Sequence, residues 1–93
     1  MGFCVQSSGL DRNSGVQKLD SSDDGDTLER QEECLKSCKS VAGVTGCELI
    51  WGQINSGCYA HTHDIAKGNG AVNHYCWVFS KCKIGKCDQI GAV

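Results

Sequence analysis

Two histidines alternate in the segment GCYAHTHD, residues 57–64, and they are the side chains of this sequence best suited to chemistry. In an extended strand, His61 and His63 point to one face together with Tyr59, because strand side chains alternate with a period of two. His74 can approach from the loop before the last strand. Three imidazoles suit zinc or copper. The alternative, which we favour, is that these histidines are exposed or half-buried polar residues, and no metal site is assigned.

A glycine-rich turn, Gly68-Asn69-Gly70, follows the histidine segment. It lacks the G-x-x-x-x-G-K-[ST] pattern of a phosphate-binding loop, and its glycines are typical of a turn with positive φ angles. Its polar backbone can line a shallow sugar site beside the histidines, because sugars need aromatic faces and planar polar groups. The predicted ligand-binding residues are Tyr59, His61, His63, Asn69, Asn73 and His74.

An acidic run precedes the first predicted helix. The stretch Asp20-x-Ser22-x-Asp24-Gly25 resembles the first half of a calcium loop, D-x-[DN]-x-[DN]-G. The twelfth position carries Gln31 in place of glutamate, and no helix is predicted before the loop. The alternative is a solvated acidic loop that favours the helix start. We favour this alternative and expect no cofactor.

Catalysis has no support among the motifs. Neither G-x-S-x-G nor H-E-x-x-H occurs in the chain. A cysteine–histidine nucleophile pair requires a free thiol with a lowered pKa, and the cysteines are expected to be bridged. We therefore expect that the protein is not an enzyme.

The bulk composition restricts the class of protein. A chain of 93 residues predicts one module, residues 1–93. The net charge is −2 with both signs mixed, which argues against a nucleic-acid partner, since such binders carry a concentrated basic patch. No stretch approaches the roughly 20 apolar residues of a membrane span, so no membrane insertion is expected.

The cysteine content is the strongest compositional signal. Eight cysteines are present: Cys4, Cys34, Cys38, Cys47, Cys58, Cys76, Cys82 and Cys87. Small secreted domains use disulfides to offset a small core, and we predict four bridges in a secreted or cell-surface protein. The spacings Cys34-x₃-Cys38 and Cys82-x₄-Cys87 are tolerable for zinc, but the first pair lies in a helical pattern without partners at zinc-finger spacing.

The pattern of elements predicts an α+β fold. A helix is expected over residues 27–41, with Asp26 as N-cap and Glu29 completing a capping box. Short strands are expected in GFCVQ and VQKL before it, and in GCELIWGQ, GCYAHT and HYCWVFSKC after it. The fold class is therefore a small disulfide-rich domain with one helix packed on a short antiparallel sheet. Its core is expected at residues 3–82, followed by a C-terminal tail at residues 83–93.

This order of cysteines and elements resembles the PAN/apple superfamily of extracellular modules. The resemblance rests on ECLKSC in the helix, GCELIW and GCYAHT in the hairpin, an early cysteine, and a last strand that ends in a cysteine. It covers roughly residues 3–82. The stretch GCYAHT…GNG…NHYCWVFSKC also looks like uncharacterised secreted proteins of marine microalgae and related protists.

The resemblance also implies a disulfide pattern. The implied bridges are Cys34–Cys58, Cys38–Cys47 and Cys4–Cys82. Cys76 and Cys87 are an addition to the family pattern: they bond to each other across the tail, or Cys87 reaches another chain. Eight cysteines allow 105 connectivities, so this one is an implication of the resemblance alone.

The resemblance implies a non-enzymatic recognition role, because PAN/apple modules bind proteins or carbohydrates and often form parts of adhesive proteins. We expect an extracellular recognition or adhesion module whose partner is a glycan or a protein. The alternative is a structural subunit of an extracellular fibre, wall or coat. That subunit would self-associate through a sheet edge or an intermolecular disulfide.

Overall fold

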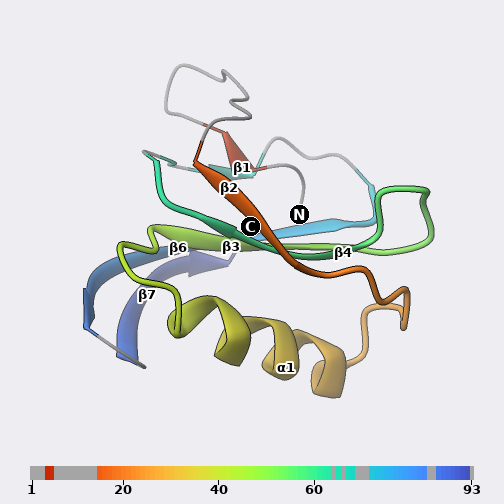
Figure 1. Cartoon of the computed structure of the whole chain (residues 1–93), viewed down its shortest axis with the longest axis horizontal. Coiled ribbons are helices and arrows are strands. Elements are labelled where there is room, and N and C mark those ends of the chain that lie inside the picture. The colour runs from red at the N-terminus through yellow and green to blue at the C-terminus, as the bar shows by residue number, and fades with distance from the viewer. Residues whose placement is uncertain are drawn as a thin grey trace.

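One helix lies on one face of a five-stranded antiparallel sheet, and a short two-stranded ribbon covers the other face (Figure 1). The computed structural model describes residues 4–5, 15–63, 65, 67–68, 72–83 and 86–92. The elements are β1 Cys4–Val5, β2 Val16–Asp20, α1 Leu28–Lys39, β3 Gly46–Ile50, β4 Gly57–His61, β5 Lys67–Gly68, β6 His74–Lys83 and β7 Lys86–Ala92. The predicted disulfide-rich α+β fold is confirmed.

The sheet is built around β3. Its order is β2-β4-β3-β6-β7, and all its pairings are antiparallel. β3 and β4 form the predicted hairpin, in which Leu49 pairs with Cys58. On the other side of β3, Cys47 pairs with Trp77 of β6. Every residue of β3 is buried, because this strand has a neighbour on both sides and a layer on both faces.

The helix packs against the sheet face that carries Cys47 and Leu49. Its own buried residues are Arg30, Cys34 and Cys38, which recur every four residues and so form one stripe. Together with the sheet they enclose the main core, whose other members are Val44, Cys47, Leu49, Cys58, Ala60, Trp77 and Phe79. The buried stripe is thus built from two cystines and an arginine, with little aliphatic surface.

The opposite face of the sheet packs against the ribbon of β1 and β5. The apolar residues of this second core are Cys4, Cys76 and Val78, with Ile65 packed against them. Gly46 lies below this layer, and a Cβ at this position would collide with the Ile65 side chain and the Trp77 carbonyl oxygen. The absence of a side chain at residue 46 therefore lets the layer approach the sheet closely.

Three disulfides hold the layers together among the described residues. They are Cys4–Cys76, Cys34–Cys58 and Cys38–Cys47. The two bridges from the helix to the hairpin are confirmed. The bridges expected from Cys4 to Cys82 and from Cys76 to Cys87 are wrong, because β1 crosses the middle of the sheet beside Glu48 and not the far end of β6. The side chains of Cys82 and Cys87 lie outside the described part of the chain.

Two element boundaries differ from the sequence-based expectation. Thr27 is the N-cap in place of Asp26, and its hydroxyl accepts a hydrogen bond from the Arg30 backbone N–H at 3.2 Å. Residues 86–92, expected within a tail, form β7 and pair with β6. The tail expectation failed because KCDQIGA has weak strand character, and β7 forms through its ladder with the long neighbouring strand.

An ion pair attaches the helix to the sheet beside the cystines. The Arg30 guanidinium donates to both carboxylate oxygens of Asp20 at the end of β2, at 2.6 and 3.1 Å. The same carboxylate accepts the backbone N–H groups of Ser22 and Cys58 at 3.2 Å. Chiefly through its hydrogen bond, Arg30 holds the pKa of Asp20 below its usual value. Asp20 therefore joins α1, β2 and β4.

The substitution Asp20→Asn is expected to lower the free energy of unfolding by about 2 kcal/mol in urea titrations at pH 7. A fully buried pair would cost more, but the Asp20 side chain is 29% exposed. Because the folded-state pKa of Asp20 is lowered, the carboxylate stabilises the fold above its unfolded-state pKa. That contribution disappears as the pH falls through the lowered value. The difference between the wild type and Asp20→Asn should therefore shrink in acid. The matched variant Glu32→Gln removes an exposed carboxylate and should change little at any pH. An equal loss for both variants would contradict this account.

Peptide mapping without reduction is expected to find the three described bridges and a fourth between Cys82 and Cys87. The backbone register pairs Lys83 with Lys86, which places residues 82 and 87 at neighbouring positions of the same hairpin. A fragment that joins Cys87 to a second chain would contradict this expectation.

Candidate functional site

A carboxylate lies in the interior of the protein, on the face of β3 that turns away from the helix. Glu48 is 4% exposed. Its Oε1 accepts the Cys4 backbone N–H at 3.1 Å and lies 2.9 Å from His61 Nε2, and its Oε2 lies 3.3 Å from His74 Nδ1. A buried carboxylate is tolerated when several N–H groups hydrogen-bond to it. Three segments supply these groups here: β1, β4 and β6.

The contacts with Glu48 favour one tautomer of each neighbouring ring. An ionised carboxylate only accepts, so a neutral His61 ring that donates from Nε2 leaves Nδ1 as an acceptor. His63 Nε2 lies 3.0 Å from this Nδ1 and donates to it. On the other side, His74 donates from Nδ1, and its Nε2 faces the side-chain nitrogen of Gln53 at 3.3 Å. The network thus runs from His63 through Glu48 to Gln53.

The structure divides the predicted ligand-binding residues into two groups. His61 and His74 are each 2% exposed, so the expectation that they are exposed or half-buried is wrong, while their part in ligand binding stays a prediction. Tyr59 and Asn73 are half-buried. The Lys18 ammonium lies 5.5 Å from the centre of the Tyr59 ring, and the Asn73 carbonyl accepts the Trp51 backbone N–H at 3.2 Å. His63 is also half-buried. Asn69 lies outside the described residues.

The sequence patterns did not predict the buried role of Glu48. Its signal is an acid inside an apolar strand, in the segment CELIW. Charged residues are almost never fully buried without partners, so an acid at that position predicts a nearby donor. Nothing in the local pattern shows that His61 and His74 approach it from two different strands.

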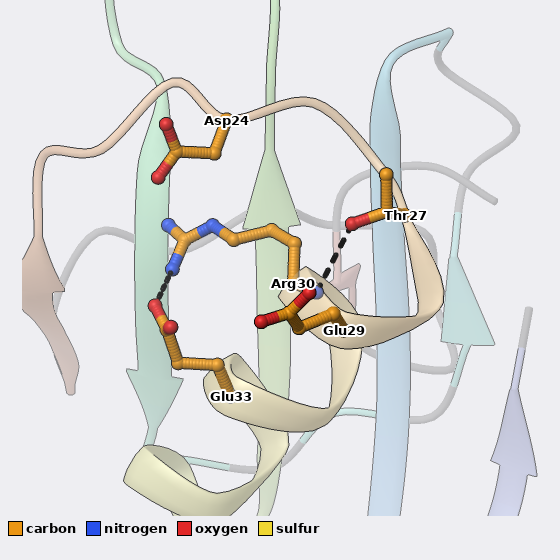
Figure 2. A pocket seen from close by; sticks show the side chains of 5 residues that line it. All are labelled: Asp24, Thr27, Glu29, Arg30 and Glu33. Carbon is orange, nitrogen blue, oxygen red and sulfur yellow. Dashed lines mark hydrogen bonds and ion pairs between the residues drawn. The ribbon is translucent and has the colours of Figure 1, made fainter.

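A polar pocket of about 300 Å³ lies at the start of α1 and is drawn in Figure 2. Its lining residues are Asp24, Thr27, Glu29, Arg30 and Glu33. The Arg30 guanidinium lies between the carboxylates of Asp24 and Glu33 (Figure 2), and its Nη1 donates to Glu33 at 2.8 Å. Three exposed carboxylates thus surround one arginine that is only 3% exposed.

Arg30 has one donor left over. Its Nη atoms bind Asp20 and Glu33 and reach the Ser22 carbonyl, while its buried Nε finds no hydrogen-bond partner among the described residues. An unpaired buried donor costs about 1–3 kcal/mol, so an acceptor that reached Nε would recover free energy. The pocket therefore combines three carboxylates with a buried arginine that has one unpaired donor among the described residues.

Asp24 is the member of the acidic run that lines this pocket, and two other carboxylates of the run are already engaged. Asp20 binds Arg30, and Asp23 accepts the Gly52 backbone N–H at 2.7 Å. The preference for a structural acidic loop over a calcium loop agrees with these contacts, because Asp20 would have to abandon Arg30 to reach a cation.

Comparison with protein-family models, with curated proteins and with solved structures finds no match to this chain. Within the described residues, no helix is long and apolar enough to span a bilayer. The three disulfides are typical of a protein in an extracellular or other oxidising environment. The two candidate sites of the described residues are therefore the pocket at the start of α1 and the histidine network around Glu48.

The substitution Glu48→Ala is expected to destabilise the protein by about 3–5 kcal/mol in urea titrations, because it leaves several buried N–H groups without their acceptor. The matched variant Glu32→Ala, at an exposed position of α1, should lose less than about 0.5 kcal/mol. A small loss at Glu48 would contradict the central role of the carboxylate.

Proposed function

We propose that the protein is a non-enzymatic, secreted or cell-surface recognition module that binds a basic segment of a protein partner. The observation that carries this proposal is the pocket at the start of α1, where Asp24, Glu29 and Glu33 surround the buried Arg30. Lysine and arginine side chains are the natural complement of clustered carboxylates.

The surrounding charge supports the choice of a basic ligand. Seven of the eleven acidic residues of the chain lie between positions 20 and 33, and Arg30 is the only basic residue in that segment. The charge of Arg30 is balanced by Asp20 and Glu33, so Asp24 and Glu29 remain available. Such a concentrated potential attracts a partner of opposite charge and accelerates its association.

The Arg30 guanidinium among these carboxylates supports a peptide ligand. A peptide offers backbone carbonyls, which accept hydrogen bonds, together with a cationic side chain for the carboxylates. A metal ion offers no acceptor, and a neutral sugar offers hydroxyl groups but no cation. The order of elements, which resembles that of PAN/apple modules, also supports a recognition role. A recognition role of this kind requires no catalysis.

A structural role is the second candidate, and the sheet edges favour it. β2 and β7 are the outer strands of the five-stranded sheet, and an outer strand presents backbone groups that a second copy can pair with. Sedimentation of the protein at increasing concentration separates the two candidates, because a recognition module stays monomeric and a fibre subunit grows in mass.

Binding is tested on an array of short peptides that differ in lysine and arginine content, with a glycan array in parallel. We expect basic peptides to bind with an affinity that falls as salt is added. The double variant Asp24→Asn/Glu29→Gln should bind about tenfold more weakly, since each exposed ion pair contributes up to about 1 kcal/mol.

The matched control is Glu32→Gln, which removes an acid of the same helix outside the pocket. It should weaken binding less than the double variant. Equal effects of both changes would show that only the overall charge matters, and binding to glycans alone would overturn the choice of ligand.

A further inference from the structure

We propose that His61 Nδ1 and His63 Nε2 form a site for a divalent cation of the zinc type, with Glu48 orienting the His61 ring. The proposal departs from the sequence-based expectation of no metal, and it is independent of the pocket at the start of α1. It rests on how the two rings converge and on what holds each of them.

The two nitrogens are close to the separation that a shared metal ion requires. His61 Nδ1 and His63 Nε2 are 3.0 Å apart, and the ring planes are inclined by 59°. Zinc binds imidazole nitrogen at about 2.0–2.1 Å in tetrahedral geometry, so two such ligand atoms lie about 3.3 Å apart. A small rotation of the half-buried His63 ring opens this distance and turns both lone pairs toward one ion.

Glu48 presets His61 for this role. His61 Nε2 lies 2.9 Å from the Glu48 carboxylate, and a proton on Nε2 directs the Nδ1 lone pair at His63. Metal-ligating histidines usually donate their other N–H to a carboxylate or a carbonyl in the same manner, which fixes the tautomer and raises the basicity of the ligand. Glu48 is therefore the hydrogen-bond acceptor that most metal-binding histidines have for their second nitrogen.

The backbone also holds His63 in position, although it lies beyond the end of β4. Its carbonyl accepts the Thr45 hydroxyl, and the neighbouring Thr62 backbone N–H donates to the Gly15 carbonyl at 2.7 Å. Gly15 packs against the ring, since a Cβ there would lie 3.1–3.3 Å from His63 atoms. Restraint of this kind lowers the entropic cost of binding.

His74 does not take part, although the sequence grouped all three histidines. It binds the other carboxylate oxygen of Glu48, whereas His61 binds Oε1. A neutral His63 ring with its proton on Nδ1 offers the Nε2 lone pair that the ion requires, so both rings bind as neutral imidazoles. Water completes the coordination, because two protein ligands leave positions open.

The experiment is a zinc titration of the oxidised full chain with ¹⁵N-labelled histidine, followed by long-range ¹H–¹⁵N NMR. Zinc alone is the probe. We expect saturation at one ion per chain, with the signals of His61 Nδ1 and His63 Nε2 shifted far more than either nitrogen of His74. Because this measurement uses the wild-type protein, it does not depend on how a variant folds.

The variants His63→Gln and His74→Gln give a matched comparison by calorimetry. His63→Gln should weaken zinc binding at least tenfold, and His74→Gln should retain the wild-type affinity. Glu48→Gln should weaken binding by about 10- to 100-fold, as for other orienting partners of metal ligands. The proposal is overturned if zinc leaves both nitrogens unshifted, if its main effect is on His74, or if His63→Gln binds as tightly as the wild type.

Discussion

A carboxylate that is buried in the middle of a central strand must be surrounded by hydrogen-bond donors, and this requirement organises one whole side of the molecule. Glu48 receives a backbone N–H from β1, one ring nitrogen from β4 and another from β6. Each of these segments is also joined to the sheet, β1 by the Cys4–Cys76 bridge and β4 and β6 by their ladders with β3. The hydrogen bonds to Glu48 and the Cys4–Cys76 disulfide therefore involve the same few residues. Both require that β1 lies across the sheet.

On the helix side of the sheet, a buried positive charge requires hydrogen-bond acceptors in the same way. Arg30 occupies the buried stripe of α1 next to Cys34 and Cys38, and Asp20 binds its guanidinium at the end of β2. In a chain of this size the apolar core alone contributes little net stability. Two cystines and one ion pair consequently hold α1 on the sheet, while aliphatic packing is limited to residues such as Leu49 and Val44.

The two candidate sites follow from these two anchors. The acidic pocket exists because Arg30 is drawn inward and leaves the exposed carboxylates of α1 and the preceding loop around it (Figure 2). The histidine pair exists because Glu48 turns His61 inward, so that its second nitrogen meets His63. Glu48 and His61 lie on the sheet face opposite the helix, so the pocket and the histidine pair can act independently.

The local pattern was sufficient for the helix, the β3–β4 hairpin and the long strand β6, because apolar periodicity and turn residues act over a few positions. The pairs Cys34–Cys58 and Cys38–Cys47 also followed, through the resemblance in cysteine order. The local pattern did not predict β7, because this strand forms through its pairing with β6. It also did not predict the partner of Cys4, which depends on where β1 crosses the sheet.

The sequence by itself determined the helix, the β3–β4 hairpin and β6, the abundance of cysteine and the concentration of acid before and within the start of α1. Only the tertiary structure decided that Leu28 is exposed while Arg30 is buried, and that His61 and His74 point inward toward Glu48. The physical reason is that the burial of a polar side chain depends on a partner from a distant segment. The free energy of that contact appears only when the two segments meet.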